Sequence, residues 1–372
     1  MKEDKPPRLI SLDALRGVIM ITMALDHANT FISHGKLELE FWAGRFPNYG
    51  DNALQFLTRF VTHLSAPGFF FLMGASMVLF AHTRRARGWT EWEITRHFFA
   101  RGLLLVALQL FVENPAWNIG SRDLGAVLLG VLYGLGTAMI VGALLLRLSS
   151  RLLVVFAIVL TLLAHALVAD PARIAFDWPL VIQLLTVPGP ASGLFVLYPT
   201  LPWLALALFG MVFGRWLLAD RASAYRRAAT IGFVFLLLFA GGRALGSFGN
   251  IRPAIGSGWI AFLNVVKYPP SLVFTFFTLG VDLLLLAAFA RVEGLLHTAL
   301  RPVVILGQNA LFFYLVHLYL YGLVGLLFGP RGTTIAGMYP YWLLGLLFLT
   351  PFCWWYGDFK HSRAPESVWR FF

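Results

Sequence analysis

Long apolar runs, separated by short charged segments, are the feature that most constrains this chain. Of its 372 residues, 59% are hydrophobic and only 13% are charged, whereas soluble domains carry about 25% charged residues. Runs of about 20 apolar residues are long enough to cross the hydrocarbon core of a bilayer as helices. We therefore expect an all-α, polytopic integral membrane protein whose first partner is the lipid bilayer.

Ten such runs follow one another along the chain, and the third and the tenth are the shortest. We expect about ten transmembrane helices within a single domain that covers residues 1–372. Two connections, 34–54 and 170–194, are long and rich in Gly, Pro and aromatic residues, which is typical of functional loops and of ordinary irregular connections alike. The predicted spans are 9–33, 55–81, 98–114, 124–147, 151–169, 195–218, 228–247, 270–291, 302–328 and 340–357.

The net charge of +11 has a topological explanation. If the N-terminus is cytoplasmic, most of the 29 Lys and Arg residues fall in cytoplasmic segments, as the positive-inside rule requires. We therefore expect a multi-pass protein of the cytoplasmic (inner) membrane with both termini in the cytoplasm, no cleaved signal peptide and no nucleic-acid partner. The single cysteine, Cys353, excludes an intrachain disulfide.

The first span carries charged and imidazole groups at both ends. A charged side chain at the centre of a transmembrane helix costs at least about 2.5–3.5 kcal/mol, so such residues mark candidate functional sites. At 3.6 residues per turn, Asp13, Arg16, His27 and His34 share one face. Asp13 and Arg16 either form an ion pair that fixes the helix or line a site at its cytoplasmic end.

A second group of polar residues should meet the outer end of this span. Arg59 and His63 are four residues apart and share a face, and Pro67 should kink their helix. We expect both to lie near Asp26 and His27 at the outer leaflet.

The last third of the chain supplies further candidates. The span 302–328 carries Asn309, Tyr314 and His317, of which the last two share a face. Lys267 precedes a Pro269-Pro270 break that could frame a site, although Lys267, like Asp282, also fits a structural role. The candidates for binding a substrate are Arg59, Asn309, Tyr314, His317 and Lys267.

Imidazole groups in a membrane suit proton transfer or covalent acyl transfer. Neighbouring helix residues point about 100° apart, so we expect Asp26 to orient His63 or His317 rather than His27. The sequence contains no H-E-x-x-H, Walker or G-x-S-x-G motif, so no metal is predicted.

Several ordered motifs together resemble one known family. The chain is similar to the heparan-α-glucosaminide N-acetyltransferase catalytic-domain family, and in particular to its bacterial branch. The similar segments are Arg8-Leu-Ile-Ser-Leu-Asp13-Ala-Leu-Arg16-Gly17, Met23-Ala-Leu-Asp26-His27, Leu57-Thr58-Arg59-Phe60-Val61-Thr62-His63-Leu-Ser-Ala66-Pro67, Phe71-Leu72-Met73-Gly74, Leu201-Pro202-Trp203, Lys267-Tyr268-Pro269-Pro270-Ser271, Leu306-Gly307-Gln308-Asn309-Ala310 and Tyr314-Leu-Val-His317.

The resemblance implies a transmembrane acyltransferase fold that uses acetyl-CoA or another acyl-CoA from the cytoplasm. It also implies a sugar or glycan acceptor, or another small molecule, at the outer face. A family histidine just beyond the first span is taken as acetyl carrier or base, and by position it matches His34, while His27 matches an earlier polar residue of the family. His27, His34 and His63 are therefore competing catalytic candidates together with Asp26, and the bacterial pattern favours His27 and His63.

The inner end of the first span fits the donor, because Arg16 beside Asp13 and the basic 84–101 segment offer cations to an anionic CoA. Two other classes of function stay open. A proton-coupled secondary transporter could use Asp26, His27 and His63 as a relay. A structural membrane component, with homo-oligomers among the possible assemblies, would not need charges at matched depth.

Overall fold

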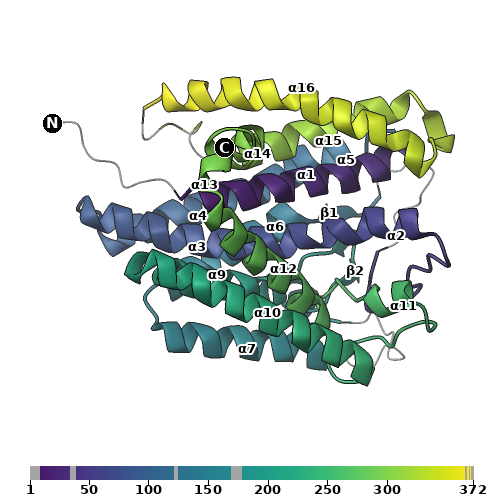
Figure 1. Cartoon of the computed structure of the whole chain (residues 1–372), viewed down its shortest axis with the longest axis horizontal. Helices are drawn as coiled ribbons and strands as arrows, with labels where there is room; N and C mark the ends of the chain where they lie inside the picture. The colour runs from purple at the N-terminus through teal and green to yellow at the C-terminus, as the bar shows by residue number, and fades with distance from the viewer. Residues whose placement is uncertain are drawn as a thin grey trace.

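The computed structural model describes residues 9–33, 39–120, 125–168, 178–364, 367 and 369. Its helices run side by side along the long axis of the molecule, with α16 at one edge and α7 at the other, and with α1 between them (Figure 1). The protein is an all-helical polytopic membrane protein. The helices are α1 (Ile10–Ile32), α2 (Ala53–Phe60), η1 (Val61–Leu64), α3 (Ser65–Ala86), α4 (Glu91–Leu108), η2 (Gln109–Glu113), α5 (Asn114–Trp117), α6 (Val131–Leu145), α7 (Ser150–Leu167), α8 (Leu180–Leu185), α9 (Thr200–Ala219), α10 (Arg221–Leu245), α11 (Trp259–Leu263), α12 (Leu272–Arg291), α13 (Glu293–His297), α14 (Arg301–Gln308), α15 (Ala310–Leu326), η3 (Gly329–Arg331) and α16 (Ile335–His361).

Each of the ten predicted ranges contains a helix, but the count of ten membrane spans is not confirmed. Within the described ranges, seven helical segments are long and apolar enough to cross a membrane, or eight if the bent pair α14 and α15 is one span. The helix α6 is a shorter apolar helix. The helix α1 carries Asp13, Arg16, Asp26 and His27 in one run, which lowers its mean hydropathy, and it lies buried inside the bundle.

Glycines allow α1 and α14 to approach within backbone contact. A Cβ at Gly17 would lie 1.9 Å from the Val303 carbonyl oxygen, and a Cβ at Gly307 would lie 1.9 Å from the Asp13 carbonyl oxygen. Small residues at helix crossings permit this approach in membrane proteins, where packing replaces the hydrophobic effect. The contact fixes the N-terminal half of α1 against α14, the first helix of the bent pair.

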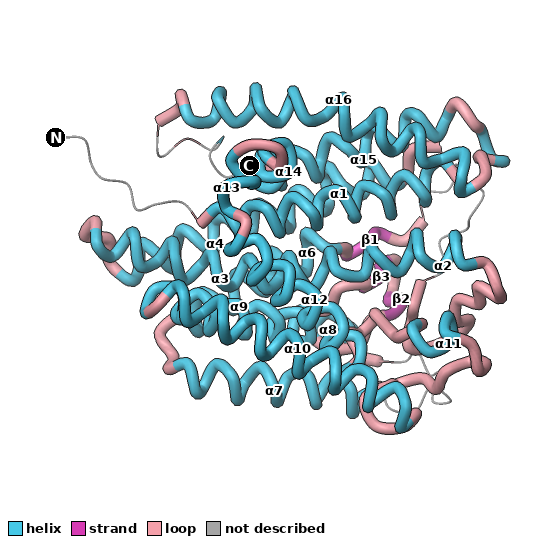
Figure 2. Tube along the Cα trace, viewed as in Figure 1, coloured by secondary structure: helices cyan, strands magenta, loops and turns pink. Residues whose placement is uncertain are grey.

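A small sheet interrupts the helical pattern that the composition predicts. The strands β1 (Val127–Leu129), β2 (Gly189–Ala191) and β3 (Leu194–Val196) pair in the order β1-β3-β2. Strand β1 is parallel to β3, with Val127 opposite Leu194, and β2 is antiparallel to β3. The strands lie among the helices (Figure 2), where β1 contacts η2 and α6 and β2 contacts α8. Leu128 of β1 and Phe195 of β3 help to enclose the site.

Three helix breaks surround the middle of the bundle. The 3₁₀ turn η1 separates α2 from α3 just before Pro67, because the proline ring clashes with the carbonyl four residues earlier, at His63. The π-helical turn η2 separates α4 from α5, and α14 meets α15 at an angle of 92° across Asn309. Such breaks occur often at functional sites, and here all three supply residues to the cavities described next. We refer to the two ends of the bundle by α1, as the Ile10 end and the Ile32 end.

Candidate active site

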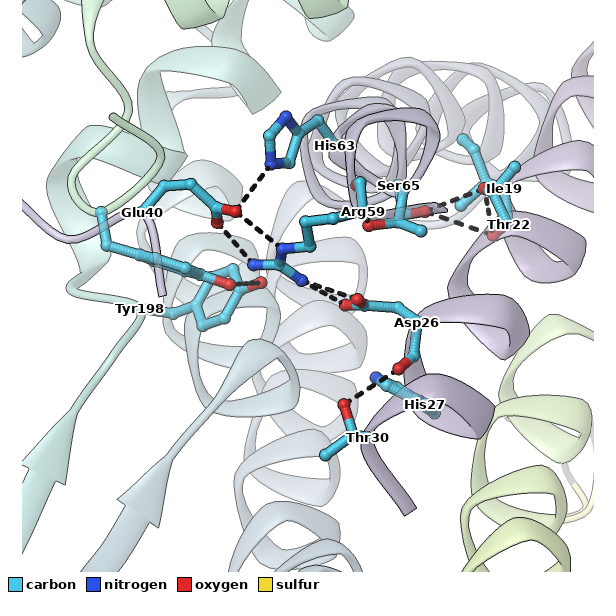
Figure 3. A network of polar contacts seen from close by, with 12 residues as sticks. Ile19, Thr22, Asp26, His27, Thr30, Glu40, Arg59, His63, Ser65 and Tyr198 are labelled. Carbon is cyan, nitrogen blue, oxygen red and sulfur yellow. Dashed lines mark hydrogen bonds and ion pairs between the residues drawn. The ribbon is translucent and has the colours of Figure 1, made fainter. Parts of the chain in front are cut away.

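A buried arginine organises the polar residues at the Ile32 end. The Arg59 Nη1 donates to both carboxylate oxygens of Asp26 at 2.7 Å, which confirms that α1 and α2 bring these residues together. A second edge of the guanidinium donates to Glu40, with Nε 2.8 Å from Oε1 and Nη2 2.6 Å from Oε2. Figure 3 shows Arg59 between the two carboxylates. Arg59 is thus fully engaged, which suits a positioning role.

Glu40 is a site residue that the sequence analysis did not identify. Its side chain is fully buried and also accepts a hydrogen bond from the Tyr49 hydroxyl at 3.2 Å. Burial alone would raise the pKa of this carboxyl, but the Arg59 guanidinium and the nearby His63 hold it well below its usual value. Glu40 is therefore an anion at neutral pH, and it ties the 39–52 segment to α2.

His63 contacts this network but lines neither of the two cavities described below. Its Nε2 is 3.4 Å from Glu40 Oε1, and its ring packs against Phe274 and Phe60. We expected Asp26 to orient the imidazole of His63 or His317, but in the structure both oxygens of the Asp26 carboxylate accept hydrogen bonds from Arg59 instead. His63 is brought to the cluster as expected, but its partner is Glu40.

His27 has a different partner, from the other side of the bundle. Its Nδ1 lies 2.7 Å from Nε2 of His317 on α15, and the two rings are stacked with centroids 4.9 Å apart. His317 Nδ1 in turn lies 2.9 Å from the Phe313 carbonyl oxygen. A carbonyl can only accept, so His317 carries its proton on Nδ1 and accepts from His27 Nδ1 through Nε2. This chain leaves His27 Nε2 unprotonated, as a base or nucleophile requires.

A cavity of about 220 Å³, here called the His27 cavity, adjoins this imidazole. Asp26, Arg59 and Lys267 contribute its charged wall, and Trp117 and Tyr314 contribute aromatic rings. The His27 ring centroid is 5.0 Å from that of Trp117 and 6.2 Å from that of Tyr314. The predicted substrate-binding residues Arg59, Tyr314 and Lys267 therefore all line one cavity with His27.

A second cavity of about 320 Å³, the Arg16 cavity, lies toward the Ile10 end. Arg16 and Arg101 supply its cations, and its other walls are mostly Met, Leu and Phe side chains. Asp13 does not line it: its Oδ1 accepts from Arg16 Nη1 at 2.9 Å and so positions that arginine, which also contacts Ser76 Oγ at 3.2 Å. Arg16 and His27, which the spacing placed on one face of α1, line neighbouring cavities.

The two cavities have three wall residues in common, Phe69, Val131 and Tyr314. Arg16 and His27 are eleven residues apart on α1, which is about 16 Å along the helix axis. The three shared wall residues therefore place the cationic Arg16 cavity directly beside the imidazole-bearing His27 cavity.

Glu113 is the second site residue that the sequence analysis missed. It lies in the π-helical turn η2, is 2% exposed, lines the His27 cavity and accepts from Trp117 Nε1 at 3.1 Å. Its Oε2 has no hydrogen-bond partner in the described part of the chain. The sequence could have identified Glu113, because a charged carboxylate inside the predicted span 98–114 is as costly in a membrane as Asp26, which was selected for that reason.

The other predicted residues fall outside this centre. Asn309 occupies the break between α14 and α15, away from both cavities, and its amide donates to the Ile305 carbonyl at 3.1 Å. His34 lies outside the described residues. Among the residues that the structure describes, His, Cys, Asp and Glu side chains form no group that could hold a metal ion.

Comparison with known proteins agrees with the resemblance in the motifs. The family model described as heparan-alpha-glucosaminide N-acetyltransferase, catalytic, matches residues 8–248. The human heparan-alpha-glucosaminide N-acetyltransferase is 29% identical over 141 residues, which is 38% of this chain and 19% of the human protein. The chain thus spans about a fifth of the length of that curated relative. Helices α11–α16, together with Lys267 and His317, lie beyond the family match. The arginine-linked network and His27 lie within it, and the chain belongs to the heparan-alpha-glucosaminide N-acetyltransferase catalytic family.

Proposed function

We propose that this protein is a membrane acyltransferase that moves an acetyl or similar acyl group from acyl-CoA to a sugar or glycan acceptor. The donor would occupy the Arg16 cavity and the acceptor the His27 cavity. The observation that carries the proposal is the position of His27, whose free Nε2 adjoins a cavity that shares three wall residues with a cationic chamber.

The donor chamber has the character that an acyl-CoA requires. Arg16 and Arg101 can pair with phosphate oxygens, for which guanidinium groups have matching geometry. Met73, Leu105 and Met139 offer an apolar surface to the thin pantetheine arm. The shared wall would let the thioester reach His27 while the charged end of CoA stays at the Ile10 end.

The reaction needs only proton transfer and positioning. His27 Nε2 takes the proton from the acceptor hydroxyl or amine as its oxygen or nitrogen attacks the thioester carbonyl. The new C–O or C–N bond forms, the C–S bond breaks, and the imidazolium returns its proton to the CoA thiolate. His317 holds the tautomer that makes Nε2 the base. In the two-step variant of this reaction, Nε2 itself carries the acyl group before the acceptor attacks.

Topology follows from the same assignment. The Ile10 end, with the donor chamber, faces the cytoplasm, and the Ile32 end faces the outside of the bacterial inner membrane. Both termini are then cytoplasmic. The family match does not favour the proton-coupled transporter.

Purified protein supplied with labelled acetyl-CoA and a panel of sugars and amino sugars tests the proposal. Because general-base catalysis contributes about 10²–10⁴-fold, His27→Ala should lower kcat by that amount. The control is His82→Ala, an exposed histidine near the end of α3. Equal activity of the two variants would overturn the role of His27, and absence of any acyl turnover by the natural protein would overturn the function itself. Labelled protein trapped without acceptor would select the two-step route.

A further inference from the structure

A large cavity at the Ile10 end belongs to neither chamber. It measures about 580 Å³ and lies between the starts of α10 and α14, the short helix α13 and the end of α16. We call it the Arg301 cavity. Its charged lining consists of Arg221, Glu293, Arg301 and Asp358, together with His297 and His361.

The charges in this cavity are arranged unevenly. Arg221 and Glu293 form an ion pair with each other. Arg301 and Asp358, by contrast, take part in no ion pair among the described residues, although both line the same cavity. Two opposite charges that face one space without meeting suit a ligand that carries both charges.

Exposed tryptophans beside the cavity point to a position at the depth of lipid headgroups. Arg301 lies over the ring of Trp354, 5.5 Å from its centroid, and Trp354 and Trp355 are 54% and 60% exposed near the end of the candidate span α16. Exposed tryptophans of membrane helices gather at the interface between hydrocarbon and water. Basic pockets between transmembrane helices are known to bind phospholipid headgroups through the phosphate.

We propose that the Arg301 cavity binds the headgroup of a zwitterionic phospholipid with a primary ammonium group, of the phosphatidylethanolamine type. The phosphate would pair with the Arg301 guanidinium, and the ammonium would donate to the Asp358 carboxylate. The acyl chains would leave along the exposed face of α16, beside Trp354. This site is independent of the acyl transfer proposed above.

A lipid in the Arg301 cavity would lie next to the break between α14 and α15. Gln308 lines both the Arg301 cavity and the Arg16 cavity, and Lys360 Nζ on α16 donates to the Gln308 carbonyl at 2.8 Å. Asn309, at the 92° break between α14 and α15, also lines the Arg301 cavity. A bound headgroup therefore braces the broken span from one side while the donor chamber lies on the other.

Lipid retention measured by native mass spectrometry, from nanodiscs of defined composition, tests the site. The lipids are phosphatidylethanolamine, phosphatidylcholine, whose ammonium cannot donate, and phosphatidylglycerol, which lacks an ammonium. Because a hydrogen bond to a charged group is worth roughly a factor of ten or more in affinity, we expect one phosphatidylethanolamine per chain, retained about tenfold over the other two.

Variants of Arg301 and Asp358 test the phosphate and the ammonium of the headgroup separately. Arg301→Gln should abolish retention, whereas Arg226→Gln, an exposed arginine on α10 at the same end and outside the cavity, should leave it unchanged. Asp358→Asn lies on an exposed position and should keep retention but remove the preference for phosphatidylethanolamine over phosphatidylcholine. Equal retention of all three lipids by the natural chain, or an unchanged preference in Asp358→Asn, would overturn the proposal even if Arg301→Gln does not fold.

A competition experiment distinguishes a lipid headgroup from a soluble phosphate ester as the ligand of this cavity. Soluble glycerophosphoethanolamine and 3′,5′-ADP are added to the lipid-bound protein at millimolar concentration. We expect neither to displace the lipid, since they lack acyl chains to pack along α16. Displacement by either soluble phosphate ester would show that the cavity serves a soluble ligand, and would overturn the assignment to a lipid.

Discussion

The Glu40 carboxylate offers a sharp test of the polar network. Substitution Glu40→Gln keeps the shape of the side chain but removes its charge. Glu40 accepts two charge-assisted hydrogen bonds from Arg59, at 2.8 and 2.6 Å, inside the protein. Breaking a buried ion pair costs about 3–5 kcal/mol. Asp26 still neutralises Arg59 in the variant, so we expect the lower end of that range, about 3 kcal/mol.

The measurement is the free energy of unfolding in mixed detergent micelles, for the natural protein and the variant. The matched control is Glu293→Gln, which removes the same charge from the exposed pair with Arg221. Exposed pairs contribute about 0–1 kcal/mol, so the control should change stability by no more than that. If Glu40→Gln and Glu293→Gln cost the same, the network is not the stabilising element described above.

The pH dependence of the free energy of unfolding provides a second test of the Glu40 carboxylate. The pKa of Glu40 is held below its usual value of 4.5. Its stabilising contribution is therefore complete at neutral pH and is lost as the pH falls below about 4.5, toward the pKa of the folded state. The stability gap between the natural protein and Glu40→Gln should be constant from pH 7 to 5 and should narrow only under stronger acid. A gap that narrows near pH 6 would contradict this assignment.

Three further outcomes are expected. His317→Leu should lower kcat at least about tenfold with little change in KM, because His27 loses the acceptor that fixes its tautomer, and His317→Gln should restore part of the rate through its amide oxygen. Gly307→Ala should cost about 1–3 kcal/mol in the same unfolding assay because no space exists for its Cβ, whereas Gly294→Ala, which has open space, should be neutral. Arg16→Gln should weaken acyl-CoA binding about tenfold in a direct binding assay and leave acceptor KM unchanged, and an unchanged donor affinity would count against the Arg16 cavity as the donor site.

The helices were predictable because apolar length is a strong signal. Every predicted range contains a helix, and the largest shifts are at helix starts. Helix α6 begins later than predicted, at Val131, because β1 occupies Val127–Leu129, whereas α4 and α10 begin earlier, at Glu91 and Arg221. Thr90 and Asp220 cap those starts, and helices can extend through polar residues that lie outside the apolar run. The number of spans was less predictable. The polar residues of α1 lower its mean hydropathy, so its length and composition alone do not identify it as a membrane span.

The site was predictable in its members more than in its contacts. Spacing placed Asp26, Arg59 and His63 at one depth, and the structure brings them together. It could not show that Glu40, from an irregular segment, would supply the second carboxylate, because no period relates a loop residue to a helix face. The partner of His27 also depends on the 92° bend before α15, which sets where His317 lies.

The shared wall of the two chambers has an electrical consequence. A protein with polar chambers on both sides of a membrane must still insulate, because one elementary charge gains about 2.3 kcal/mol for each 100 mV that it crosses. Under the proposed function, Phe69, Val131 and Tyr314, which line both cavities, would be the dielectric barrier between them, and a pantetheine arm in transit would replace water there rather than admit it. Widening this constriction, as in Val131→Gly, would turn a transferase into a proton leak, which a pH-sensitive dye sealed inside proteoliposomes would report.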